Sequence, residues 1–161
     1  MAKDSRRVEA YGAVDELNSL LGVVISGCRD PKIALELKAV QRMLFVAGAD
    51  LATEGDSRAK VPRITRHHTA AVEEMTDRAL KSLPPLTNFI LPGGSKLASE
   101  LQFARAVCRR VERRVVAASK AESVNGELLP FFNRLSSYLF NISRVANMKA
   151  RRKEDPWKGS D

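Results

Sequence analysis

The stretch that decides the fold runs from Ser95 to Lys120 and reads SKLASELQFARAVCRRVERRVVAASK. Its apolar residues recur every three or four positions, which places them along one side of a helix. This stripe consists of Leu97, Leu101, Cys108, Val111 and Val115. Ser95 is a typical N-cap, because its hydroxyl can accept a hydrogen bond from a backbone N–H of the first turn. The stretch therefore predicts a long helix that buries one face.

The same spacing recurs through the rest of the chain. It predicts four further helices, over Val8 to Ile25, Pro31 to Ala52, Thr65 to Ser82 and Glu127 to Arg152. No stretch shows the sustained two-residue alternation of a half-buried strand. Five helices with short connectors indicate an all-α protein with an up-and-down bundle. We expect residues 1–161 to form a single domain, with residues 153–161 as a flexible tail.

Composition narrows the class of protein. Of the 161 residues, 44% are hydrophobic and 29% are charged, which is ordinary for a globular protein and excludes a disordered one. No apolar run approaches the ~18 residues that a membrane-spanning helix needs, and no signal peptide follows Met1. Cys28 and Cys108 are too few and too far apart for a disulfide framework or a zinc site. We therefore expect a cytoplasmic protein with no membrane partner.

The formal net charge of +8 suits nucleic acid, anionic lipid or a polyphosphate equally well. The position of the arginines is more informative. One face of the long helix carries Arg105, Arg109, Glu112 and Arg113, and a neighbouring stripe carries Arg110 and Arg114. Such a run can be a solvated face in which the glutamate is an internal partner. It can also be an anion clamp, because guanidinium groups bind phosphate oxygens in pairs.

A third interpretation is a small nucleic-acid-binding bundle that uses this arginine face and the basic residues 149–153. Aromatic residues do not interleave with the basic run as stacking platforms would, and Trp157 is isolated in the tail. We therefore expect no nucleic-acid partner.

Three polar residues lie beside the apolar stripes of other helices. Asn133 sits among aromatic residues, where either a buried partner or a capping role would account for it. Asp15 and Glu16 interrupt the apolar stripe of the first helix. Glu16 suits an exposed rim, whereas Asp15 is a natural partner for an arginine of the long helix.

Conventional catalytic motifs are absent from the sequence. His67 and His68 are adjacent, so on a helix they point about 100° apart and do not suit one metal ion. Neither a serine nucleophile elbow nor a complete phosphate-binding P-loop is present. Gly93 and Gly94 precede the long helix, where the backbone could approach a ligand, although such a pair is more often only a turn. An enzyme with this sequence would depend on positioning and charge stabilisation, with the ligand supplying the reactive atom.

Four blocks of sequence resemble the PduO-type ATP:cob(I)alamin adenosyltransferases. They cover residues 7–19, 89–94, 103–114 and 133–140, and the match runs in the right order from about Lys3 to Met148. The resemblance implies a ferritin-like trimer of five-helix bundles, with ATP and cobalamin bound at the subunit interfaces. It also implies transfer of the 5′-deoxyadenosyl group of ATP to the cobalt of cob(I)alamin, with release of triphosphate.

The resemblance also assigns roles to single residues. Those implied for ATP are Lys3, Arg109, Arg110, Glu112, Arg113 and Asn133. Phe89 would displace the axial ligand of cob(II)alamin and Phe140 would line the same pocket, while ordinary core packing is the alternative for both. Asp15 would pair with Arg105 across the subunit interface. Mg²⁺ on the triphosphate and a flavin-dependent reductase as partner complete the implied system.

The sequence departs from the family pattern in two places. The segment of the form T-x-T-G-D-x-G-x-T, which wraps the triphosphate, does not precede Lys3 in this sequence. Position 137 is a serine where the family pattern has an aspartate. For the first departure we weigh a truncated sequence, a misassigned start and a natural variant with weakened ATP binding. The natural variant leaves open a corrinoid-binding or carrier protein that has lost ATP turnover with its phosphate loop.

Overall fold

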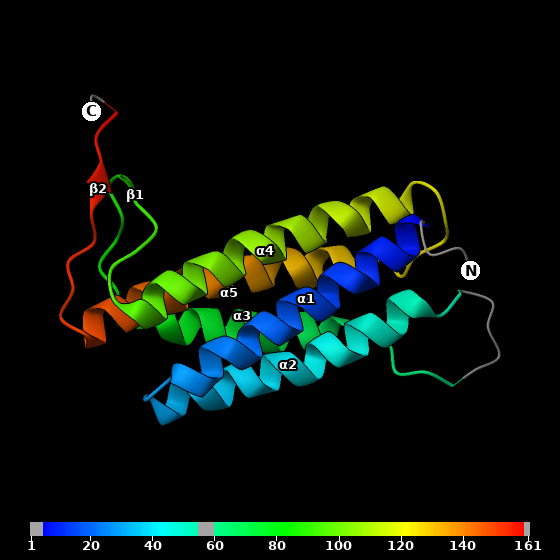
Figure 1. Ribbon diagram of the computed structural model, residues 1–161, viewed down its shortest axis with the longest axis horizontal. Coiled ribbons are helices and arrows are strands. Elements are labelled where there is room, and N and C mark those ends of the chain that lie inside the picture. The colour runs from blue at the N-terminus through cyan, green and yellow to red at the C-terminus, as the bar shows by residue number, and fades with distance from the viewer. Residues whose placement is uncertain (1–4, 55–59, 160–161) are drawn as a thin grey trace.

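Five antiparallel helices form the body of the molecule. The structure is a computed structural model that describes residues 5–54 and 60–159. The helices are α1 (Arg6–Gly27), α2 (Pro31–Ala52), α3 (Arg66–Lys81), α4 (Lys96–Ser119) and α5 (Leu128–Lys149). Each helix runs opposite to the one before it, so α3 and α5 run in the same direction (Figure 1). The predicted up-and-down bundle is confirmed, and α2 has the predicted bounds.

Side-chain caps explain where α1, α2 and α4 begin. The Ser5 hydroxyl accepts the N–H of Val8 at 3.2 Å, and the predicted cap Ser95 accepts the N–H of Ala98 at 3.2 Å. The carboxylate of Asp30 accepts from the first turn of α2, whose first residue is Pro31. Proline suits this position because its missing N–H would have no partner within the helix.

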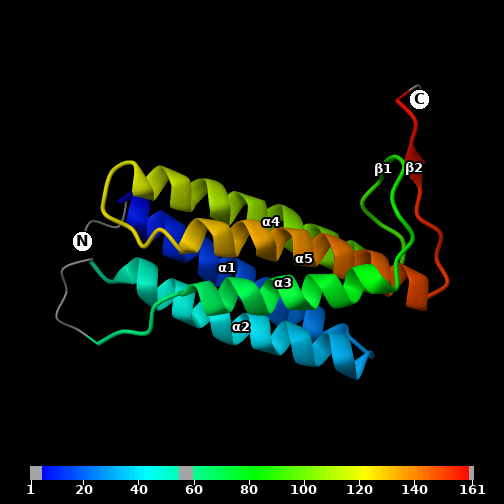
Figure 2. The ribbon, with the colours of Figure 1, turned by 180° about the vertical axis from the view of Figure 1, so that it is seen from behind.

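The long helix α4 packs between two other helices. It packs against α1 and α5, while α2 covers α1 and α3 covers α5 (Figure 2). Leu101, Cys108, Val111 and Val115 of the predicted stripe are fully buried, and Leu97 is partly buried. None of the helices in the part of the chain that the structure describes is long and apolar enough to cross a bilayer.

A short two-stranded unit projects from the end of the bundle where α4 begins (Figures 1 and 2). Strand β1 (Phe89–Ile90) pairs antiparallel with β2 (Pro156–Trp157), which places Phe89 opposite Trp157. We call residues 86–92 and 154–158 the arm. No strand is predicted here, since two residues are too short to show alternation. Trp157 is therefore not isolated, because it pairs with Phe89. That residues 153–161 form a flexible tail remains a prediction.

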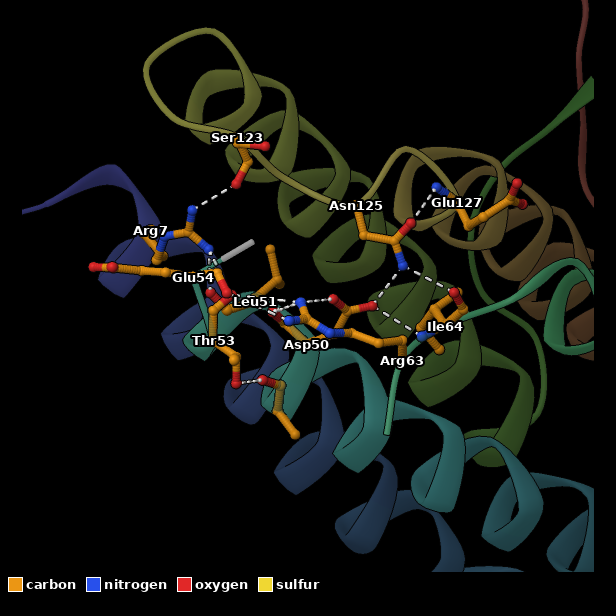
Figure 3. A network of polar contacts seen from close by, with 11 residues as sticks. Arg7, Asp50, Leu51, Thr53, Glu54, Arg63, Ile64, Ser123, Asn125 and Glu127 are labelled. Atoms are coloured by element: carbon orange, nitrogen blue, oxygen red, sulfur yellow. Dashed lines mark hydrogen bonds and ion pairs between the residues drawn. The ribbon is translucent and has the colours of Figure 1, made fainter. Parts of the chain in front are cut away.

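A buried arginine of α1 joins α2 and the segment between α4 and α5 at the opposite end of the bundle (Figure 3). Arg7 is only 2% exposed and donates to the carbonyl oxygens of Leu51 at 2.8 Å and Ser123 at 2.7 Å. It also pairs with the carboxylate of Glu122 at 2.7 Å. These contacts hold the start of α1 against the end of α2 and the segment between α4 and α5.

A buried aspartate organises the same end (Figure 3). Asp50 is 1% exposed and accepts from Arg63 at 2.8 Å, from the N–H of Ile64 at 2.9 Å and from the amide of Asn125 at 2.7 Å. Because a buried carboxylate is costly unless it is fully bonded, these partners are needed for the charge to remain inside. The aspartate thus holds together the segment that precedes α3 and the segment that precedes α5.

Candidate functional site

A cavity of about 570 Å³ lies between the arm and the adjoining faces of α4 and α5. The arm contributes Leu86, Thr87, Asn88, Phe89, Ile90 and Pro92, and the helices contribute Gln102, Arg105 and Phe140. Apolar side chains from the arm and Phe140 therefore face polar side chains from α4. This combination suits a large ligand with an apolar part and a polar edge.

Phe89 is the most exposed large apolar side chain in this region. It is 80% exposed, so the core-packing alternative is wrong for this residue. Its ring centroid lies 6.5 Å from that of Trp157, with the planes inclined by 58°. Trp157 is a site neighbour that the sequence reasoning missed, since only the pairing of β1 with β2 brings it here. A solvated phenylalanine on a backbone-paired strand is available to a ligand.

A second hollow, of about 260 Å³, continues along the same faces of α4 and α5. It shares Arg105 and Phe140 with the first cavity and adds Arg109, Ser136, Ser137 and Asn141. Phe140 is half-buried and lies at the junction, so it lines the site instead of packing wholly in the core. Ser137, the departure from the family pattern, lines the second hollow.

Glu112 connects α4 to α5 beside this second hollow. One of its carboxylate oxygens accepts from Arg109 at 2.8 Å, and the other accepts from the amide of Asn133 at 3.3 Å. Arg134 in turn donates to the side-chain oxygen of Asn133 at 3.1 Å and to Glu73 on α3 at 2.9 Å. The family resemblance assigns Arg109, Glu112 and Asn133 to the nucleotide; the structure brings their side chains together, and their role stays a prediction.

The remaining arginines of α4 divide into two groups. Arg110 pairs with Glu16, and Arg114 pairs with Glu9, both on α1. Arg113 is exposed and makes no ion pair within residues 5–54 and 60–159. The stripe next to α1 is therefore neutralised within the chain, whereas the face beside the hollow retains positive charge that an anion can use.

Asp15, on α1, forms no ion pair with an arginine of α4 in the same chain. It is exposed, and it lines a groove of about 390 Å³ between α1 and α2 together with Tyr11, Asn18 and Phe45. Arg105 instead donates to the side-chain oxygen of Gln102 at 2.8 Å. The predicted ion pair between Asp15 and an arginine of the long helix is therefore wrong within one chain. The pairing of Asp15 with Arg105 of another subunit stays a prediction.

Titratable side chains near the site offer no nucleophile. Burial raises the pKa of the Cys108 thiol well above its usual range, with the nearby Glu112 carboxylate adding to the shift. The thiol therefore stays protonated and unreactive.

The histidines do not form a metal site among the residues that the structure describes. His68 completes the cap of α3, with its Nδ1 accepting the N–H of Thr65 at 3.0 Å. Across the described ranges no three potential metal-binding side chains gather in one place.

Known proteins match this chain over most of its length. The family model for cobalamin adenosyltransferase matches residues 1–146. The chain belongs to the cobalamin adenosyltransferase family. The corrinoid adenosyltransferase of Bacillus subtilis (strain 168) is 42% identical over 154 residues, which cover 92% of this chain and 78% of that protein. The corrinoid adenosyltransferase of Mycobacterium leprae (strain TN) is 43% identical over 155 residues, which cover 91% and 81%.

Solved structures agree with this membership. A variant PduO-type ATP:corrinoid adenosyltransferase from Lactobacillus reuteri, complexed with cobalamin and ATP, superposes with a TM-score of 0.94 at 36% identity. The match covers 99% of this chain and 90% of that chain. The cavity and the adjoining hollow of this cobalamin adenosyltransferase family member are therefore the candidate binding site. The family residue Lys3 lies outside the described residues, so its place in the site stays a prediction.

Proposed function

We propose that this chain transfers the 5′-deoxyadenosyl group of ATP to the cobalt of cob(I)alamin and releases triphosphate. One observation carries the proposal. The apolar cavity beneath Phe89 adjoins the hollow beside Arg109, and both share Arg105 and Phe140. A corrinoid and a nucleotide bound there would meet along one continuous surface, as this reaction requires.

The chemistry explains why the site lacks a general base. A cobalt–carbon bond forms at C5′ while the C5′–oxygen bond breaks, and the electron pair of that bond leaves with the triphosphate. Cob(I)alamin is itself the nucleophile, so no side chain has to activate one. The protein holds C5′ in line with cobalt and stabilises the charge on the leaving group.

Arg109 and Arg113 are the side chains that we assign to the triphosphate. Glu112 holds Arg109 at 2.8 Å, which orients the guanidinium before a ligand arrives. Asn133 supports Glu112 from α5. We place Arg110 at the edge of the nucleotide, because Glu16 already partly neutralises it. Mg²⁺ would be held mainly by phosphate oxygens and water, which is its usual coordination in nucleotide sites.

The corrinoid half of the site relies on apolar contact. We assign Phe89 to the side of cobalt that an axial ligand would take, and Phe140 to the lining of the same cavity. Removal of that ligand makes cob(II)alamin easier to reduce, and a flavin-dependent reductase would supply the electron. The exposure of Phe89 supports this role, because a core residue could not reach a ligand.

We further propose a homotrimer in which Asp15 of one subunit pairs with Arg105 of the next. Asp15 lies in an open groove beside the exposed Phe45, and Arg105 has only Gln102 as its partner within the described chain. Exposed apolar surface marks interaction sites, and Phe45, which is 73% exposed, gives this groove such a surface. The pairing would fix Arg105 at the junction of the cavity and the hollow.

An anaerobic titration tests the function. The purified chain is mixed with cob(I)alamin and then with MgATP, while the absorption spectrum and triphosphate are followed. Conversion to adenosylcobalamin with equal release of triphosphate is the expected result. Cobalamin binding without an ATP-dependent change would contradict it and favour the corrinoid carrier.

A further inference from the structure

Two buried polar side chains of α5 hold the base of the arm. Arg144 and Asn147 are 3% and 5% exposed and lie three residues apart, so they face the same side of the helix. Neither belongs to the lining of the cavity or of the adjoining hollow. Buried polar groups require partners, and both residues find theirs in the segments that carry β1 and β2.

Arg144 joins the two segments before they pair. Its Nε donates to the carboxylate of Glu154 at 2.8 Å, just before β2. Its Nη2 donates to the carbonyl oxygen of Pro84 at 2.8 Å, before β1. One guanidinium thus fixes the chain ahead of each strand of the arm, and the ion pair is well shielded because the arginine side chain is only 3% exposed.

Asn147 fixes the chain where it leaves β1. Its amide donates to the carbonyl oxygen of Gly93 at 2.9 Å, and its side-chain oxygen accepts the N–H of Ser95 at 2.8 Å. Gly94 between them has a φ of +107°, and a Cβ there would lie 2.2 Å from the Asn147 side-chain oxygen. The turn from the arm into α4 is therefore built around this asparagine.

The arm has little else to hold it in place. A two-stranded unit is marginal by itself, and the ring of Phe89 is almost fully solvated. We propose that Arg144 and Asn147 are positioning residues that hold Phe89 over the corrinoid cavity. This inference rests on the proposed function of the cavity. Because the hydrogen bonds of Arg109, Glu112 and Asn133 within the described residues do not involve the arm, we assign the two residues to the corrinoid half of the site and not to the ATP half.

The experiment uses Trp157, the single tryptophan of the chain, as a built-in reporter of the arm. Glu154→Gln removes the charge that Arg144 binds, and Asn147→Ala removes both contacts to the turn. The matched control is Glu122→Gln, which removes the charge that an equally buried arginine, Arg7, binds at the other end of the bundle. Tryptophan anisotropy, the melting temperature and the KM values for cob(I)alamin and ATP are measured for each protein.

We expect both arm variants to show lower Trp157 anisotropy and a KM for cob(I)alamin raised about tenfold, because one weakens the charge-assisted contact of Arg144 and the other removes the two hydrogen bonds of Asn147. Their KM for ATP should stay within about twofold, and Glu122→Gln should change neither KM despite a similar loss in melting temperature. Unchanged anisotropy in both variants, or equal rises in the two KM values, would overturn the proposal. Anisotropy needs no turnover, so inactivity of the wild-type chain refutes the proposed function separately.

Discussion

Arg109 and Glu112 lie one turn apart on α4 and are joined by a hydrogen bond of 2.8 Å. The pair is half solvated on the arginine side, so it contributes little to the stability of the bundle. Its value is orientation, because Glu112 is itself held from α5 by Asn133. The guanidinium is therefore directed into the hollow before a nucleotide binds.

Substitution Arg109→Ala should lower turnover at saturating cob(I)alamin by about tenfold or more, because a positioned donor to the leaving triphosphate is lost. The melting temperature should not change, since the side chain is exposed. Arg109→Lys is the control that retains charge without the paired geometry, and it should be intermediate. Wild-type turnover in Arg109→Ala would remove this residue from the site.

Substitution Phe89→Ala should slow adenosylation by different factors from the two oxidation states of the corrinoid. Adenosylation that starts from cob(II)alamin with a reductant should slow far more than adenosylation from cob(I)alamin prepared beforehand. The fold should lose no more than about 0.5 kcal/mol, because the ring is not part of the core. Equal slowing from both starting states would show that Phe89 has no part in removing the axial ligand.

The proposed contact between subunits can be tested by exchanging its charges. Asp15→Arg and Arg105→Asp should each weaken the trimer and lower activity by about tenfold, because like charges would then face each other. The double variant should recover both properties in part. Sedimentation equilibrium and the adenosylation rate give the two readouts. If each single variant remains trimeric and active, the two residues do not meet.

Acid stability should depend on the contact between Asp30 and Lys149. The hydrogen bond from Lys149, at 2.6 Å, and next the N–H of Ile33 hold the pKa of the Asp30 carboxyl below its usual value. A lowered pKa stabilises the fold above the unfolded value of about 3.9, and this contribution is lost as the pH falls through the folded pKa.

Asp30→Asn should therefore be less stable than the wild type at pH 7 by about 1 kcal/mol or less, because asparagine still caps the helix and Lys149 is exposed. Urea unfolding at several pH values should show the two proteins converging below about pH 4. A constant difference across this range would mean that the charge of Asp30 has no role.

The helices could be predicted because apolar residues recur in each of them at helical spacing. Pro31 and Ser95 mark two of the helix starts, and the structure places helices directly at them. The arm could not be predicted in this way. Its strands have two residues each, and their pairing depends on where α5 ends relative to α4.

The site was predictable where its residues share one helix. The spacing of Arg109 and Glu112 on α4 places them together, and the family resemblance added Asn133 from α5. The buried partners of Arg7 and Asp50 were not predictable, because they are backbone atoms and side chains brought together only by the packing of distant segments. Charge alone does not reveal whether an arginine is solvated or buried.

The position of β2 has a practical consequence for protein engineering. A chain shortened to end at Lys153 would retain all five helices, and circular dichroism would find it almost unchanged. It would nevertheless lack both Glu154 and the strand opposite Phe89. Affinity tags and fusion partners are therefore better attached elsewhere than directly after Trp157, where their bulk would stand beside Phe89 and the cavity that we assign to the corrinoid.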